Sequence, residues 1–203
     1  MMRKGELTHQ AILERATGLA SEVGLEGLTI GALATDLQLS KSGLFAHFHS
    51  KEALQLQVLE HGAAVFVERV IRPALAQPRG ELRMRALFER WLDWTQSSPL
   101  PGGCLFVQAA VELDDRPGPV RDRLVEFQRQ WLAVIVTSME LGIEAGAFHN
   151  VADPEQFAQD LYGVMLAYHH ASRLLRDPRA EARARRAFDA LVHAASVPAE
   201  KHR

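Results

Sequence analysis

The chain has 203 residues, of which 47% are hydrophobic and 24% charged, and its formal net charge is −2 at pH 7. This length suits one or two domains with a sizeable core, and the near-neutral charge excludes a polycation that coats nucleic acid indiscriminately. The one cysteine, Cys104, excludes a disulfide within the chain and fits a reducing compartment. The N-terminal stretch lacks the apolar core of a signal peptide, and the apolar runs are too short to span a bilayer. We therefore expect a cytoplasmic protein without membrane contact.

The first predicted element is an amphipathic helix. Thr8 is a candidate N-cap, and Ile12, Ala16 and Val23 repeat at helical spacing. Gly24 then ends the helix, because glycine readily adopts the left-handed conformation that follows a helix C-terminus. This predicts one helix packed against whatever the next residues form.

The stretch Leu28–Leu54 predicts two short helices joined by a tight turn and followed by a third. Thr29 is placed to cap the first short helix and Ser40 to cap the second, because each side-chain oxygen can accept a backbone N–H bond of the first turn. In the second short helix Leu44 and Phe48, four residues apart, form an inward face. This is the layout of a helix-turn-helix, whose second helix enters the major groove of DNA.

The outward positions of this stretch carry groups that can contact DNA. Lys41 can donate to guanine or to a phosphate, Ser42 can reach a base or the backbone, and Phe45 offers an apolar face to a thymine methyl. His47 and Lys51 can donate to phosphate oxygens. The candidate DNA-binding residues are Thr29, Lys41, Ser42, Gly43, Phe45, His47 and Lys51.

The run GLTIGALATDLQLSKSGLFAHFHSKEAL resembles the DNA-binding region of TetR-type transcriptional repressors. In that family a threonine opens the second helix, a K-x-x-L-[YF]-x-H-F run forms the recognition helix, and a Lys-Glu pair opens the fourth helix. The resemblance covers roughly residues 8–55. Two positions depart from it: Phe45 stands where tyrosine is frequent and so lacks a hydroxyl for phosphate, and Gly43 stands where threonine is usual.

Beyond residue 50 the sequence predicts further helices and no strand. A long helix runs from Ser50 to about Gln77, kinked or ended by Pro73, and Asp153 caps a later one. We therefore expect an all-α fold, with a helix-turn-helix domain at residues 1–50 and a helical effector-binding and dimerisation domain at residues 51–203. The further helices are expected at residues 81–97, 104–113, 120–145, 155–176 and 180–196.

Aromatic bulk gathers on helices that surround an effector pocket in TetR-type proteins. Taken singly, such residues are more often part of a core, but the resemblance implies a cavity for a small, largely apolar effector. Gln108, Glu112 and His169 are the candidate polar anchors. The candidate effector-binding residues are Phe66, Trp91, Trp94, Cys104, Gln108, Glu112, Trp131, Met165 and His169.

A homodimer is expected, because one short recognition helix reads few base pairs and two copies on a palindromic operator give adequate specificity. The last two helices carry an apolar stripe that is larger than a single subunit is expected to cover. The candidate dimer residues are Phe157, Leu161, Tyr168, Leu175, Phe188, Leu191 and Val192.

Two other classes of protein are alternatives to a ligand-responsive repressor. A small all-α enzyme could use Cys104, Glu112 or His169, but the sequence shows no base beside the thiol, no metal triad and no phosphate loop. A helical adaptor leaves the polar outward face of residues 40–51 unexplained. We therefore expect no enzymatic activity, no cofactor and no metal site, and the expected partners are double-stranded DNA, a small-molecule effector and a second copy of the chain.

Overall fold

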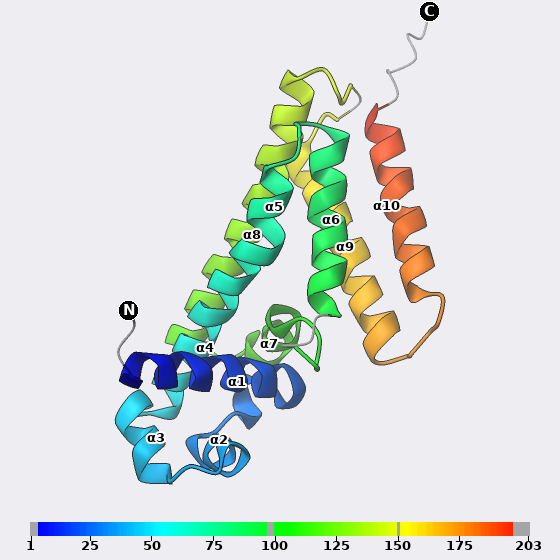
Figure 1. Ribbon diagram of the computed structural model, residues 1–203. Coiled ribbons are helices and arrows are strands. Elements are labelled where there is room, and N and C mark those ends of the chain that lie inside the picture. The colour runs from blue at the N-terminus through cyan, green and yellow to red at the C-terminus, as the bar shows by residue number, and fades with distance from the viewer. Residues whose placement is uncertain (1–3, 97–99, 150, 197–203) are drawn as a thin grey trace, which may run out of the picture. The chain divides into compact units, whose positions relative to one another are not determined.

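The computed structural model describes residues 4–96, 100–149 and 151–196, and all regular structure in these segments is helical (Figure 1), which confirms the predicted all-α fold. None of the helices in these segments is long and apolar enough to cross a membrane. The helices are α1 (Lys4–Gly27), α2 (Ile30–Leu37), α3 (Lys41–Phe48), α4 (Lys51–Phe66), the π-helical turn η1 (Val67–Ile71), α5 (Arg72–Leu75), α6 (Glu81–Thr95), α7 (Leu105–Leu113), α8 (Pro119–Glu144), α9 (Pro154–Arg173) and α10 (Ala180–Ser196).

The chain forms two compact units. The first comprises residues 1–66 and 94–128, and it contains α1 to α4 together with α7. The second comprises residues 67–93 and 129–203, and it contains most of α6 and α8 with all of α9 and α10. The unit that holds the predicted helix-turn-helix therefore extends beyond residue 50.

Helix α1 differs from the prediction at both ends. It begins at Lys4, one turn before Thr8. Helical hydrogen bonding continues to Gly27, but Gly24 has φ +79° and ψ 165°, outside the helical region. Because the backbone turns there, Leu25 takes the buried position, and Val23, expected inside, is 46% exposed.

The long helix that follows the helix-turn-helix is interrupted by the π-helical turn η1. Pro73, in the first turn of α5, has no N–H to donate to the carbonyl of Arg69, and its ring would clash with that carbonyl in a regular α-helix. A wider turn just upstream relieves this conflict. Pro73, predicted to kink or end the long helix, is thus preceded by a local widening, and the helix ends two residues later at Leu75.

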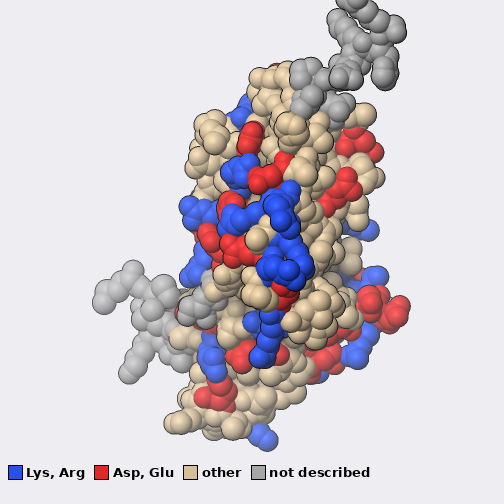
Figure 2. Space-filling model, turned by 90° about the vertical axis from the view of Figure 1, so that its right-hand side faces the viewer, with Lys and Arg blue, Asp and Glu red and all other residues tan. Residues whose placement is uncertain are grey.

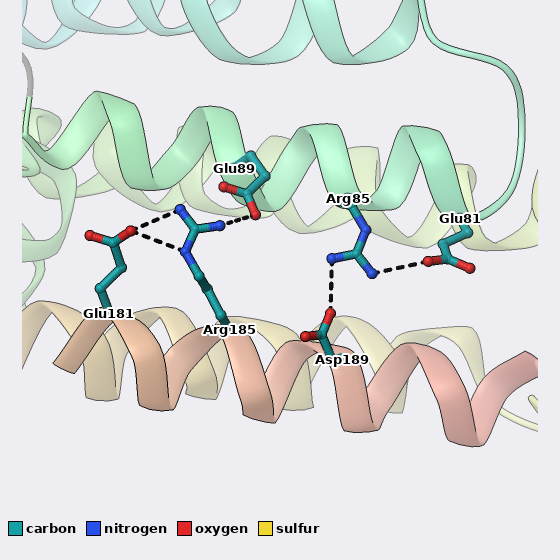
Figure 3. A network of polar contacts seen from close by, with 6 residues as sticks. All are labelled: Glu81, Arg85, Glu89, Glu181, Arg185 and Asp189. Carbon is teal, nitrogen blue, oxygen red and sulfur yellow. Dashed lines mark hydrogen bonds and ion pairs between the residues drawn. The ribbon is translucent and has the colours of Figure 1, made fainter. Parts of the chain in front are cut away.

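In the second unit, α6 and α10 are joined by aromatic stacking and by ion pairs. The rings of Phe88 and Phe188 stack in parallel, with centroids 4.4 Å apart. Beside them, Arg85 donates to Glu81 at 3.0 Å and to Asp189 at 2.8 Å (Figure 3). Exposed ion pairs contribute little singly, so the buried stack is the larger contribution to stability. A second arginine cluster in Figure 3 links Arg185 to Glu89 and Glu181.

Arginine is frequent at the end of α9 and along α10. The face shown in Figure 2 carries basic and acidic side chains intermixed rather than a uniform basic patch. Arg183, for example, pairs with Asp177, which also accepts from the backbone N–H of Arg179 at 2.9 Å. This mixture is typical of a solvated surface.

The apolar stripe assigned to a dimer contact needs correction. The single chain itself buries five of the seven side chains, so a second subunit is not needed to cover them. Leu191 is half-buried and Leu175 is 63% exposed. The five buried side chains are Phe157, Leu161, Tyr168, Phe188 and Val192.

Candidate DNA-binding surface and effector region

Both helices of the helix-turn-helix begin at side-chain caps, as the sequence predicts. Thr29 Oγ1 accepts from the backbone N–H of Ala32 at 3.0 Å, and Ser40 Oγ accepts from that of Gly43 at 3.1 Å. Between the helices Gln38 adopts the left-handed conformation, with φ 55°, and ends α2. These local features fix where α3 starts and which way its side chains face.

Helix α3 has a buried face and an exposed face. Leu44 and Phe48 are completely buried, whereas Lys41 and Ser42 are exposed and Phe45 is 54% exposed. A large aromatic side chain left in solvent on a capped helix is available to an external partner. The structure therefore places these three candidate residues together on one accessible surface.

Thr29 and Gly43 lie close to this surface, where Gly43 is also exposed. A Cβ atom added at Gly31 would lie 3.7 Å from Lys41 Nζ and 3.8 Å from Thr29 Oγ1. The Lys41 ammonium is therefore near the N-terminus of α2, whose free N–H groups also favour an anion. Between α1 and α2, Arg15 makes two hydrogen bonds of 2.6 Å to Asp36, a pair that no local sequence pattern revealed.

His47 and Lys51 are less free than the other candidates. The His47 ring is half-buried, with its centroid 5.5 Å from that of His9 on α1. Lys51 Nζ donates to the carbonyl oxygen of Glu26 at 2.7 Å and to its carboxylate at 3.2 Å. Any phosphate contact by Lys51 must share the ammonium with Glu26.

The candidate effector residues divide between the two units. In the first unit, Phe66 packs edge-to-face against Trp94 and Phe106, with centroids 5.3 and 5.9 Å apart. Cys104 lies at the start of α7 and is fully buried, which raises the pKa of its thiol. Gln108 is half-buried on the same helix.

In the second unit, Trp91 packs edge-to-face against Tyr168, at a centroid distance of 6.1 Å. Met165 and Trp131 are buried, and His169 is half-buried on α9. The aromatic candidate effector residues thus belong to the cores of both units.

Glu112 requires a correction. It was expected to anchor an effector, but its carboxylate accepts from the backbone N–H of Glu26 at 3.1 Å and lies against Gly24. The side chain is therefore engaged with the non-helical turn at residues 24–26, near the end of α1. The described residues contain no group of three His, Cys, Asp or Glu side chains that could hold a metal ion.

A groove on the second unit was not anticipated from the sequence. It lies between α8 and α9, has a volume of about 390 Å³, and is open to solvent. The lining residues recur at helical spacing on each helix. In a sequence, that spacing does not show whether such residues line an open groove or are covered by a neighbouring helix. The lining residues are Arg129, Leu132, Ala133, Val136, Thr137, Glu155, Ala158 and Gln159.

His169 is expected to make stability depend on pH. Its Nε2 atom is buried and has no hydrogen-bond partner among the described residues, and burial, followed by the charges of Arg173 and His170, lowers its pKa. The unfolded chain therefore takes up a proton at higher pH than the folded chain does, and stability should fall as the pH drops below about 6.5. His61, whose pKa burial also lowers, acts in the same direction.

Thermal unfolding followed between pH 8 and pH 5 checks this effect. The His169→Gln variant should lose part of the acid-induced fall in Tm. The exposed His193 provides the control, since His193→Gln should keep the wild-type profile. A profile unchanged in both variants would assign the acid sensitivity to other groups.

Comparison with known proteins gives two family matches. The model of bacterial regulatory proteins of the tetR family matches residues 12–58, and that of the tetracyclin repressor-like C-terminal domain matches residues 80–188. The HTH-type transcriptional repressor NemR of Escherichia coli (strain K12) is 25% identical over 171 residues, which cover 83% of this chain and 85% of that protein.

Solved structures agree with these matches. A TetR transcriptional regulator from Chloroflexus aurantiacus superposes with a TM-score of 0.82 at 26% identity, covering 95% of this chain and 96% of that one. The structure of AibR in complex with isovaleryl coenzyme A and operator DNA gives a TM-score of 0.68 at 21% identity, covering 94% and 98% of the two chains. At 21% identity the second likeness concerns the fold alone.

Proposed function

This chain belongs to the TetR family of bacterial regulatory proteins and is a DNA-binding transcriptional regulator, and we propose that a small, largely apolar effector releases it from a palindromic operator. The observation that carries the proposal is the exposed face of α3. It presents a cation, a hydroxyl and an aromatic ring on a helix whose other face is buried. A helix of this kind can enter the major groove and contact base edges.

A response to an effector is supported by the aromatic residues of both units and by relatives. NemR is a repressor, and AibR was crystallised with both isovaleryl coenzyme A and operator DNA. Apolar and aromatic groups are the usual lining of small-molecule sites. The enzyme alternative lacks such support, because the buried Cys104 thiol has a raised pKa, which disfavours the thiolate that nucleophilic catalysis needs.

The dimer proposal now rests on the exposed faces of α9 and α10, which pack along each other within the second unit. Gly163, Leu166 and Ala167 are exposed on α9, and Ala190 is exposed beside the half-buried Leu191 on α10. Small and apolar side chains at these spacings suit close packing of helices from two copies. We propose that this surface, rather than the buried stripe, forms the homodimer contact.

Titration of fluorescent duplexes tests the DNA-binding proposal. The protein should bind a duplex recovered by selection at least about 10³-fold more tightly than a random duplex of equal length, at the same salt concentration. Equal affinity for both duplexes would show that binding is nonspecific. Release of the selected duplex when an apolar compound is added, together with a change in tryptophan emission, would support the proposed response to an effector.

Lysine variants separate base reading from backbone contact. Lys41→Ala should weaken operator binding by about 1–3 kcal/mol with little change on random DNA, if the ammonium reads a base. Lys51→Ala should weaken both duplexes and lower the slope of log affinity against log salt by about 0.9, if the ammonium that Glu26 shares also contacts one phosphate. If Lys41→Ala weakens the affinity for both duplexes equally, Lys41 contacts the phosphate backbone of DNA rather than a base.

A further inference from the structure

The non-helical turn of the backbone at residues 24–26, near the end of α1, is held by a helix that is distant in sequence. At Gly24, where φ is +79°, an added Cβ atom would lie 1.6 Å from Oε1 of Glu112, a residue of α7. The other oxygen of the same carboxylate accepts from the backbone N–H of Glu26 at 3.1 Å. The glycine therefore leaves room for a carboxylate that bonds the turn two residues later.

The carboxylate of Glu26 joins the same network. Its Oε2 atom pairs with Arg116 Nη1 at 3.0 Å and with Lys51 Nζ at 3.2 Å. On α4, Gln55 donates to the carbonyl oxygen of Leu25 at 2.7 Å. The polar groups of the turn are thus bonded on one side by the start of α4 and on the other by residues at and just after the end of α7.

This turn determines where the DNA-reading helices begin. The backbone N–H of Leu28 donates to the carbonyl of Gly24 at 3.2 Å, and Leu28 is completely buried. Thr29, the N-cap of α2, is the next residue. A shift of residues 24–26 must therefore move the cap of α2 and, through the tight turn that follows, α3.

We propose that Glu112 and Arg116 are positioning residues for the DNA-reading helices. Their bonds to the Gly24–Glu26 turn hold α2 and α3 in the arrangement that binds the operator, although neither residue contacts DNA. Both residues lie outside the segment 12–58 that matches the family's DNA-binding region. Displacement of the end of α7 then lowers operator affinity, and an effector acting on α7 has a direct route to the reader. This inference rests on the proposed DNA-binding function.

The test compares Glu112→Ala with Asp115→Ala. Both variants remove one negative charge from the same part of the chain, but Asp115 is exposed, and only Glu112 bonds the turn. Glu112→Ala should lower operator affinity by about tenfold and speed hydrogen exchange of the Glu26 amide, whereas Asp115→Ala should leave both unchanged. Glu112→Gln, which keeps an oxygen acceptor, should restore much of the affinity, and Arg116→Ala should give a smaller loss because the pair is exposed.

Each outcome decides the proposal. Operator affinity of Glu112→Ala within twofold of the Asp115→Ala control would overturn it. So would a loss accompanied by equally faster exchange throughout the first unit, since that result describes general destabilisation. If the wild-type protein selects no operator, the proposed function itself fails, and exchange at the Glu26 amide still reports whether Glu112 holds the turn.

Discussion

Replacing Phe48 with alanine should abolish operator binding by unfolding the helix-turn-helix. Phe48 is completely buried, and its ring lies 5.3 Å from that of His9 on α1. Deleting a buried phenylalanine side chain typically costs about 3–5 kcal/mol, through lost burial and the cavity that remains. A small helical region is not expected to tolerate such a loss, since native domains are stable by only about 5–15 kcal/mol.

Phe45 provides the matched control, because it is the same residue type on the same helix but is 54% exposed. Phe45→Ala should change stability by less than about 0.5 kcal/mol, as expected for an exposed position. Its operator affinity should still fall by about tenfold, the size of one lost base contact.

Circular dichroism melts and duplex titrations on both variants give the comparison. We expect an unfolding defect only for Phe48→Ala and a DNA-binding defect for both variants. Unaltered operator affinity in Phe45→Ala would remove Phe45 from the reading surface. Wild-type stability in Phe48→Ala would contradict the packing of α3.

A charge placed on the exposed face of α9 should give a monomer with greatly weakened operator binding. Leu166 is 39% exposed in the single chain, so Leu166→Glu should disturb the folded subunit little. In a symmetric dimer the two introduced carboxylates face the same interface and oppose association by desolvation and repulsion. Loss of the second half-site contact should lower operator affinity by about 100-fold or more.

Sedimentation and duplex titration at matched concentrations measure these effects. Leu82 on α6 is 59% exposed, and Leu82→Glu makes the same substitution on a helix other than α9 and α10. That control should remain dimeric and keep its affinity. A wild-type protein that is monomeric at micromolar concentration, or a Leu166→Glu variant that stays dimeric, would be incompatible with the proposed contact.

Local features of the DNA-binding region could be predicted from the sequence because their causes are local. The caps at Thr29 and Ser40 depend on side-chain oxygens next to helix starts, and both are present in the structure. Asp153 likewise caps α9, accepting from the backbone N–H groups of Glu155 and Gln156 at 3.0 Å. Helical periodicity also placed Leu44 and Phe48 inside.

Features that depend on distant residues could not be predicted in the same way. Periodicity shows which side of a helix is apolar, but it does not show whether the same chain or a second copy covers that side. For this reason Phe188, which stacks on Phe88, was assigned to a dimer contact. The contacts of Glu112 and Lys51 with Glu26 could not be predicted for a similar reason, since they join residues more than twenty positions apart in sequence.

Selection of DNA from a random duplex library, followed by sequencing, tests the central claim most directly. We expect enrichment of a palindromic sequence whose half-sites are centred about one helical turn, or about 10 base pairs, apart. The Lys41→Ala variant, selected in parallel, should lose base preference at one position of each half-site. If no sequence is enriched over the starting library at physiological salt, sequence-specific DNA binding is contradicted.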